Sequence, residues 1–500
     1  MNNTFNFSEF SKQSSKGIFV IYISLIYSAL KISWIFIFLI FKDFSEISNT
    51  KLLYISLGIG IILLFLLIRA ILIYKNFQFK ITNNHFILKQ GILKKSNTSI
   101  PFDKIQNINF KQNIIQQIIN VYEVCIETAG STKTEIGIKA LPFLKATALK
   151  ELILSNKVFE NSEKEKEAQK PLLKVDILSL FKVSLTENHL QNLFLFFAVL
   201  FGFYNQIQQI TDGLGKTESL DGFIEENTNN FSASIFLILI LIIGFTVIAF
   251  LSSFVRVFLL HFNLTTYLKK DAFEINQGLF TKKSIVLKKQ KVQNITISTN
   301  PLKRLIGVSF ITFKQAVSGK LNTKKKDKLI RIVGCKKHQI ETIKSSLFHF
   351  SKVENSAIHF PDDYYKRRIF MFSFLFLTVL YTGLYFIFSH IEIFYSLLLI
   401  IPIAVFLILK KVKKRFYKIS EDMLLVGRGL LETHLIYLEI FKVQNIEMKQ
   451  TIFQKRSKVA DIILQTASGK IKIPCIHYKE ALKIYNHTLY KVETSTAPWM

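Results

Sequence analysis

The chain has 500 residues, of which 50% are hydrophobic, and a formal net charge of +30. Its mean hydropathy of +0.30 excludes an ordinary soluble protein, and with the basic charge it indicates apolar segments that alternate with lysine-rich ones. The three cysteines, Cys125, Cys335 and Cys475, lie far apart, which excludes a disulfide framework and favours a reducing compartment for the soluble parts.

Six apolar runs approach or exceed the length of about 20 residues that a membrane helix needs. In chain order they are Ile18–Phe41, Leu52–Tyr74, Leu190–Ile210, Ser234–Phe262, Ile369–Ser389 and Ile393–Leu409. The runs come in pairs, so the sequence predicts three transmembrane helix pairs. The third run is the weakest because it ends in Asn205-Gln206, and a buried core helix is the alternative for it.

Flanking charges predict the orientation of these helices. Basic residues follow the second, fourth and sixth runs, whereas the loop after the third run has five carboxylates between Asp212 and Glu226 and one lysine, Lys216. Because cytoplasmic loops are rich in Lys and Arg, we expect this loop outside a bacterial inner membrane and both termini and all soluble parts in the cytoplasm. The basic residues at the helix ends, which are also our candidates for contact with anionic lipid, are Arg69, Lys75, Arg256, Lys410, Lys411, Lys413, Lys414 and Arg415.

An internal repeat follows each helix pair. A glycine followed by two apolar residues stands at Gly91, Gly278 and Gly429. Thirteen residues later a Lys-Ile/Val-Gln-Asn-Ile segment begins, and an alanine follows its lysine by 25 residues in all three places. Because these intervals are identical without a gap, the sequence predicts three copies of one domain.

Each copy has the pattern of several strands followed by one helix. Alternating apolar and polar residues predict strands, for example at Phe77–Ile81 and Phe416–Ile419. Further strands are expected at Val121–Thr128, Val308–Lys314, Ala460–Thr466 and Lys470–Ile473, and closing helices at Leu144–Leu154, His338–Phe348 and Tyr478–Tyr490.

This order of elements and the repeated motif resemble the bacterial PH domain family. Three such domains, each preceded by a helix pair, resemble the YdbT-type membrane proteins of that family. The resemblance implies three α+β PH-like domains, each an antiparallel barrel or sandwich closed by a C-terminal helix, together with six membrane helices. We expect these boundaries: residues 1–75 for the N-terminal segment and first helix pair, 76–155 for the first domain, 156–189 for a charged linker and interfacial helix, 190–262 for the second pair, 263–350 for the second domain, 351–410 for a linker and the third pair, and 411–492 for the third domain.

The repeated polar motif has two interpretations. In the first, its lysines bind an anionic headgroup while its amides line a pocket or a protein edge. In the second, its amides form hydrogen bonds with backbone groups where the strand bends. We favour the structural interpretation, because repetition in diverged copies follows the fold as readily as function. The residues concerned are Lys104, Gln106, Asn107, Lys291, Gln293, Asn294, Lys442, Gln444 and Asn445.

Basic side chains are densest in the middle copy. Anionic lipid attracts such residues. We expect lipid and not nucleic acid as their partner, because the domains are tethered to a bilayer. The alternative is a basic surface that is simply solvated. The amphipathic spacing of Leu172–Phe181 predicts an interfacial helix, or else a helix packed on the first domain. The basic residues of the middle copy are Lys269, Lys270, Lys282, Lys283, Lys288, Lys289, Lys291, Lys303 and Arg304.

The sequence has no motif for catalysis, for a cofactor or for a metal ion. We therefore expect a non-enzymatic membrane scaffold whose domains bind lipid, one another or a partner. The family resemblance implies a smaller membrane protein with one PH domain as a partner, and a role in envelope stress or in resistance to membrane-active compounds; a homo-oligomer is a further option. The alternative is a channel or transporter component, which the scarcity of ionisable residues in the apolar runs disfavours.

Overall fold

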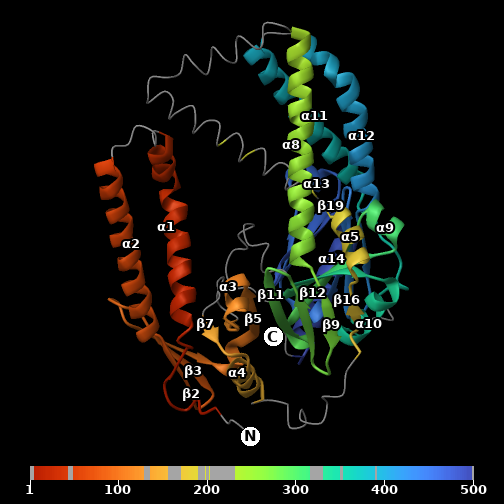
Figure 1. The fold of residues 1–500 in the computed structure, drawn as a ribbon. Helices are drawn as coiled ribbons and strands as arrows, with labels where there is room; N and C mark the ends of the chain where they lie inside the picture. Colours follow the sequence, from red (N-terminus) through yellow and green to blue (C-terminus); the bar gives the residue numbers. More distant parts are fainter. Residues whose placement is uncertain are drawn as a thin grey trace.

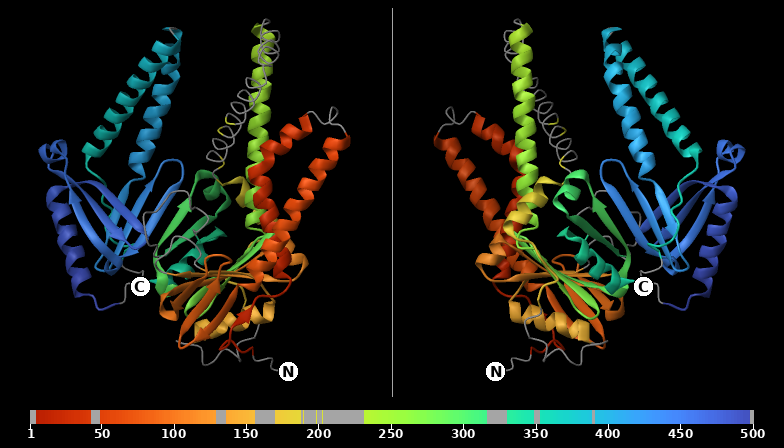
Figure 2. Two further views of the ribbon diagram at one scale, coloured as in Figure 1. Left: turned by 90° about the vertical axis from the view of Figure 1, so that its left-hand side faces the viewer. Right: turned by 90° about the vertical axis from the view of Figure 1, so that its right-hand side faces the viewer.

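The computed structural model describes residues 5–42, 49–128, 136–155, 170–187, 189, 198, 202, 231–315, 330–348, 353–388 and 391–497. Three β-rich domains follow one another in a row, and the long helices rise on one side of that row (Figure 1). The side views show the row in chain order, with the helices of the first and third domains rising on the same side of it (Figure 2).

The long helices are α1 (Gly17–Lys42), α2 (Asn49–Lys75), α8 (Phe231–Leu260), α11 (Asp363–Phe388) and α12 (Leu397–Lys413). Among the described residues, four helical segments are long and apolar enough to cross a membrane: Leu52–Lys75, Ile243–Leu260, Asp363–Phe386 and Phe394–Lys413. The prediction of six spans is therefore supported for four. In α1 the described apolar stretch is the shorter Gly17–Ile32, and the run Leu190–Ile210 lies almost entirely outside the described residues.

Each domain has two three-stranded halves joined by a short 3-10 turn, and a helix follows its last strand. Domain 1 has β2 (Gln78–Thr82), β3 (His85–Gln90), β4 (Ser96–Pro101), β5 (Ile105–Asn113), α3 (Ile114–Ile118), β6 (Tyr122–Thr128), β7 (Ile136–Leu141) and α4 (Phe143–Ser155). Domain 2 has β9 (Thr265–Leu268), β10 (Ala272–Gln277), β11 (Thr281–Lys288), β12 (Val292–Thr299), α9 (Pro301–Ile306), β13 (Ser309–Gln315), β14 (Ile330–Cys335) and α10 (Lys337–Leu347). Domain 3 has β15 (Phe416–Ile419), β16 (Met423–Gly429), β17 (Thr433–Glu439), β18 (Val443–Lys449), α13 (Ile452–Arg456), β19 (Val459–Thr466), β20 (Gly469–His477) and α14 (Tyr478–Thr494).

The sheets cross the domain boundaries. The second half of domain 1 joins the first half of domain 2 in a seven-stranded sheet of order β7-β6-β5-β11-β10-β9-β8. The second half of domain 2 joins the first half of domain 3 in a six-stranded sheet of order β14-β13-β12-β17-β16-β15. The outer halves form sheets of their own, β1-β2-β3-β4 at one end, where β1 is Ser11–Lys12, and β18-β19-β20 at the other.

The hydrophobic cores follow this sharing of sheets. Successive strand residues point to opposite faces, so Ile436 and Leu438 of β17 pack in the core of domain 3. Tyr437 lies between them in sequence and packs in the core of domain 2, beside Leu435 at its margin. Domain 2 therefore completes its core with side chains from domain 3.

The repeat glycines fall in the tight turns between the second and third strands. Gly91, Gly278 and Gly429 have φ of 114°, 105° and 144°, values that L side chains rarely adopt. A Cβ at any of them would overlap the carbonyl oxygen of the residue three positions later. The turn therefore requires glycine, which explains why this position recurs in all three copies.

The segment Leu172–Phe181 differs from the predicted single helix. Leu173 and Lys174 form β8, which pairs with β9 of domain 2, and the helix α5 begins only at Ile177 and extends to Leu185. Its buried residues Leu180 and Val183 pack in the core of domain 2, not on domain 1. The charged linker that precedes it, residues 156–169, lies outside the described residues.

Candidate functional site

The repeated motif begins at the end of the 3-10 turn and continues into β5, β12 and β18. In every domain the pairing with the next strand shifts at the motif glutamine: between Ile105 and Asn107, between Val292 and Asn294, and between Val443 and Asn445. The glutamine is thus the extra residue of a β-bulge, which bends a strand and increases its twist. The side chain of Gln106 lies outside those that the structure describes; Gln293 is fully buried and Gln444 is exposed.

The motif asparagine reaches the following domain at both junctions. Asn107 Nδ2 donates to Gln315 Oε1 at 2.7 Å, and Gln315 Nε2 donates back to Asn107 Oδ1 at 3.1 Å. At the second junction Asn294 Nδ2 donates to Ser468 Oγ at 2.6 Å. Asn107 and Asn294 are 2% and 1% exposed, whereas Asn445 of domain 3 is exposed.

The three motif lysines lie in different surroundings. Lys442 is buried at the second junction, where its Nζ donates to the carbonyl of Val292 at 2.7 Å and pairs with Glu439 at 2.7 Å. Lys291 is half-buried and Lys104 is exposed. The structure therefore gives these lysines no common headgroup pocket within the part of the chain that it describes.

The two junctions have the same strand register. At the first junction Lys282 of β11 lies opposite Gln112 of β5. At the second, Thr433 of β17 lies opposite Thr299 of β12. Each of these pairs joins the residue four places after the repeat glycine to the residue eight places after the motif lysine. Two independent pairs of domains thus use one docking geometry.

The short helix after the motif strand also contacts the next domain. In domain 1, Gln117 Nε2 of α3 donates to the carbonyls of Leu279 and Phe280 at 3.0 and 3.2 Å. In domain 2, Lys303 Nζ of α9 donates to Glu432 Oε1 at 2.6 Å. Both contacts end on the glycine turn of the following domain, so each junction joins a strand, an asparagine and a short helix to the next domain.

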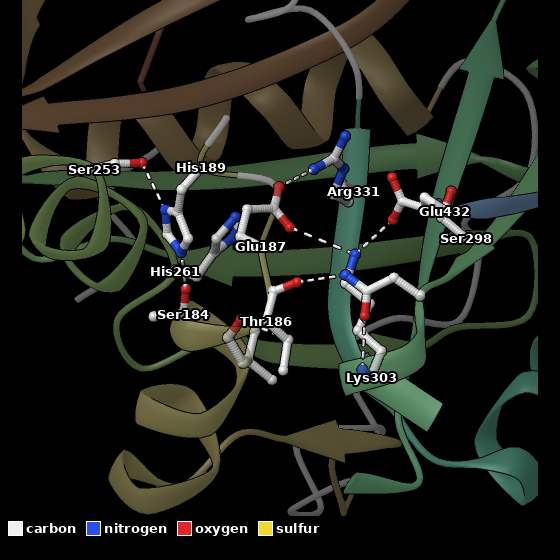
Figure 3. A network of polar contacts seen from close by, with 12 residues as sticks. Ser184, Thr186, Glu187, His189, Ser253, His261, Ser298, Lys303, Arg331 and Glu432 are labelled. Atoms are coloured by element: carbon white, nitrogen blue, oxygen red, sulfur yellow. Dashed lines mark hydrogen bonds and ion pairs between the residues drawn. The ribbon is translucent and has the colours of Figure 1, made fainter. Parts of the chain in front are cut away.

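A charged network lies at the second junction (Figure 3). Lys303 is only 1% exposed, and its Nζ lies 2.6 Å from Glu432 and 3.6 Å from Glu187. Arg331 Nη1 lies 2.7 Å from Glu187, and Asn300 caps α9 while its Nδ2 donates to the carbonyl of Thr186 at 2.7 Å. A buried cation is tolerated when it is paired, and this pairing ties the end of α5 to domains 2 and 3.

Two histidines lie close to this network. His434 Nδ1 is 2.7 Å from Ser298 Oγ across the β12·β17 pairing, and its Nε2 is 3.8 Å from Glu432. Burial lowers the pKa of His434 although Glu432 opposes that shift. The neutral imidazole of His434 is therefore the form that the junction favours.

His189 bridges Ser253 of α8 and the carbonyl of Ser184 of α5, each at 2.8 Å.

The candidate lipid-contact residues at the helix ends divide into two groups. Lys414 is half-buried and its Nζ donates to the carbonyls of Leu430 and Leu431 at 2.8 and 2.7 Å. Arg415 is half-buried, and it donates to the carbonyl of Lys472. These two side chains hold domain 3 against the end of α12. The other candidates are exposed: Arg69, Lys75, Arg256, Lys410, Lys411 and Lys413.

A cavity of about 510 Å³ lies between domains 1 and 2. Lys150 of α4 and Lys269 approach the same carboxylate, that of Glu274, at 3.9 and 2.5 Å. Burial alone would raise the pKa of Glu274, but the two ammonium groups outweigh burial and hold that pKa below its ordinary value. Since Lys282 and Lys283 also line the cavity, its lining is basic and suits an anionic group.

Among the described residues, no cluster of three or more His, Cys, Asp or Glu side chains is placed to hold a metal ion. Burial raises the pKa of the thiols of Cys125 and Cys335 to about 12 and that of Cys475 to about 11. The thiols are thus held protonated at neutral pH, which is the unreactive form.

Comparison with known proteins agrees with the repeat. The bacterial PH domain family matches residues 20–157, 206–349 and 372–492. The chain belongs to the bacterial PH domain family. It is also similar to the UPF0699 transmembrane protein YdbT of Bacillus subtilis (strain 168), with 22% identity over 437 residues that cover 84% of this chain and 86% of the relative. This member of the bacterial PH domain family therefore carries three copies of the domain beside apolar helices.

Sequence reasoning missed the partners of the motif. Gln315 and Ser468 lie in the next copy, 208 and 174 residues from the asparagines that they contact, and nothing in the local sequence points to that distance. Lys303 belonged to the predicted basic surface, and the structure corrects this because the side chain is buried between two carboxylates. Asn300-Pro301, a helix start, was the available signal for α9.

Proposed function

We propose that the chain is a non-enzymatic membrane scaffold that presents three PH domains as one row on the cytoplasmic surface. The observation that carries this proposal is the repeated junction, in which β5·β11 and β12·β17 pair in one register. Strand addition of this kind gives a firm main-chain interface. A row held in this way keeps its domains at fixed spacing, which is what a scaffold requires.

The position and side chains of the glycine turns indicate that the row lies against the membrane surface. In domain 2 the Gly278 amide donates to the carbonyl of Phe262, just after α8, at 2.8 Å. The side chains at the turn tips are apolar and exposed: Leu93 is 99% exposed, Phe280 52% and Leu431 49%. Apolar tips beside basic helix ends suit the boundary between headgroups and acyl chains, so we place these turns in contact with anionic lipid.

Topology is the first test of this proposal. Single cysteines introduced at the exposed positions Asn120, Lys337 and Lys479 should be labelled by a membrane-impermeant maleimide only after the cells are permeabilised, and a cysteine at residue 220 should be labelled in intact cells. Labelling of residue 120 in intact cells would refute the cytoplasmic placement. As a control, each variant should contain only the one introduced cysteine and should insert fully into the membrane.

Lipid contact is tested on the full chain in reconstituted vesicles. Replacement of Lys410, Lys411 and Lys413 by Gln should reduce the preference for anionic over neutral lipid, because anionic lipid attracts each cation by about 1 kcal/mol near the surface. The matched control is Lys414→Gln, whose side chain bonds within the protein and should change stability more than lipid preference. An unchanged lipid preference in the triple variant would contradict the proposal.

The biological setting that the family resemblance suggests is envelope stress or resistance to membrane-active compounds. The test is growth of a deletion strain with and without a membrane-active peptide, complemented by the intact chain. Equal sensitivity of the deleted and complemented strains would contradict this setting without bearing on the scaffold geometry.

A further inference from the structure

The row of domains ends in two strand edges that match the junctions. Within the described part of the chain, β18 is the edge strand of its sheet, and it occupies in domain 3 the place that β5 and β12 occupy in domains 1 and 2. At the other end β4 is the edge strand of its sheet, and it corresponds to β11 and β17. One chain thus carries both halves of a third junction.

The exposure of the motif distinguishes β18 from its counterparts. Asn107 and Asn294 are nearly fully buried because the next domain covers them. Gln444 and Asn445, in the same motif, are exposed in domain 3. Ile452 and Phe453 of α13 are also 75% and 67% exposed, in the helix that corresponds to α3 and α9, which contact the next domain. Domain 3 therefore presents the complete docking surface of this fold.

We propose that β18 of one chain pairs with β4 of a second copy, so that the row of PH domains continues from chain to chain. The inference goes beyond the scaffold function proposed above, which a single chain can perform. Exposed strand edges are templates for this kind of pairing. The helices of domains 1 and 3 rise on the same side of the row (Figure 2), so a second copy added at either end keeps its helices on the membrane side.

The register of the two existing junctions specifies the contacts of the third. At the existing junctions His434 lies opposite Ser298, and Lys283 lies opposite Lys111. By the same spacing from the repeat glycine and the motif lysine, Ser96 of β4 corresponds to His434 and Lys283, and Lys449 of β18 corresponds to Ser298 and Lys111. The exposed side chains of Asn97 and Ser99 on β4 are small, so the backbones can approach. Pro101, which lacks an amide donor, corresponds to Glu439, one residue beyond the last pair of β17 with β12.

Disulfide trapping in the membrane tests this pairing. A tagged chain with Ser96→Cys is co-expressed with a differently tagged chain with Lys449→Cys, and mild oxidation should link them, because directly opposite strand residues lie within disulfide reach. The native thiols are buried or half-buried and protonated, so the parent chain is the background control. Lys470→Cys, exposed on β20 at the far edge of the same sheet, replaces Lys449→Cys as the matched control and should give no linked dimer.

A blocking variant separates docking from folding. Asn445→Arg changes a side chain that is exposed in the single chain but would be buried in the pairing, so it should abolish the linked dimer. A Lys111→Cys, Lys283→Cys pair placed in the same variant reports the internal junction, where these residues lie opposite, and should still close within one chain.

Absence of a mixed dimer between the Ser96→Cys and Lys449→Cys chains that retain Asn445, while the Lys111→Cys, Lys283→Cys pair closes in a chain that also retains Asn445, would overturn the proposal. A disulfide from Lys449→Cys to a different protein would overturn the second copy as the occupant of β18. A mixed dimer that persists with Asn445→Arg would overturn the assigned surface.

Discussion

The motif asparagine lies in two different environments although its local sequence is the same. Asn294 is buried and bonded to Ser468 of domain 3, whereas Asn445 is exposed. A side-chain amide contributes to stability mainly when its loss leaves a buried partner unsatisfied. Position along the row, and not the motif itself, therefore decides what each asparagine contributes.

This difference gives a matched pair of substitutions. Asn294→Ala should lower the free energy of unfolding by about 1–3 kcal/mol, because the buried polar groups at the junction lose a partner. Asn445→Ala should change it by less than about 0.5 kcal/mol, as exposed substitutions usually do. Thermal and denaturant unfolding of the purified, monomeric full chain measures both. Equal effects of the two variants would contradict the assignment of Asn294 to a junction.

Lys303 is the second residue whose role follows from its surroundings. Removal of one partner from a buried ion pair costs about 3–5 kcal/mol, and we expect the lower end for Lys303→Met because Glu187 and Glu432 are 19% and 22% exposed. Lys269→Met is the control: Lys269 also pairs with a glutamate but is 44% exposed, and an exposed pair contributes less than about 1 kcal/mol. A similar loss of melting temperature in both variants would argue against the buried network.

At the scale of elements, the pairing of β12 with β17 contains a titratable contact. His434 lies opposite Ser298 and faces charged groups from several elements, namely Glu432 and Arg428 of domain 3 and Lys303 and Arg331 of domain 2. Burial keeps the pKa of His434 below its ordinary value, so the folded junction binds fewer protons than the unfolded chain.

The sign of the pH dependence follows from this. Because the folded pKa is depressed, the contribution of His434 is fully present above the ordinary histidine pKa of about 6.5 and is lost as the pH falls through and below it. The full chain should therefore melt at a lower temperature at about pH 5.5 than at pH 7.5, and His434→Gln should reduce that difference. An unchanged difference in the variant would assign the acid sensitivity to other groups.

At the scale of the whole molecule, the domains are not equivalent folding units. The core of domain 2 includes Leu180 and Val183 from α5 and Met423, Leu425 and Tyr437 from domain 3. Among the described residues, the core of domain 3 contains residues of domain 3 alone, including Ala481 and Ile484 of α14. A domain that loses part of its core on excision loses the corresponding hydrophobic stabilisation.

Excision of single domains should show this asymmetry. A fragment of residues 263–350 should be digested rapidly by protease and should lack a cooperative unfolding transition, because eight buried residues of its core lie outside the fragment. A fragment of residues 411–492 should resist protease, since its core is self-contained. Circular dichroism and limited proteolysis measure both fragments. Cooperative unfolding of the domain 2 fragment would contradict the shared core.

The sequence by itself determined the features that depend on neighbouring residues. Alternation along Phe416–Ile419 predicted the strand at the same residues, and the spacing from Gly91, Gly278 and Gly429 identified three copies because each turn requires a glycine conformation. The family and the membrane character also followed from local patterns, namely the repeated motif and the apolar runs.

Only the tertiary structure decided how the three domains join. The pairing of β5 with β11 and of β12 with β17 connects residues more than a hundred positions apart, and no local pattern separates these edges from the edge of β18. The same local motif buries Asn107 and Asn294 and exposes Asn445. Strand edges offer the same main-chain groups whatever their side chains, so the choice of partner lies in the arrangement of whole domains.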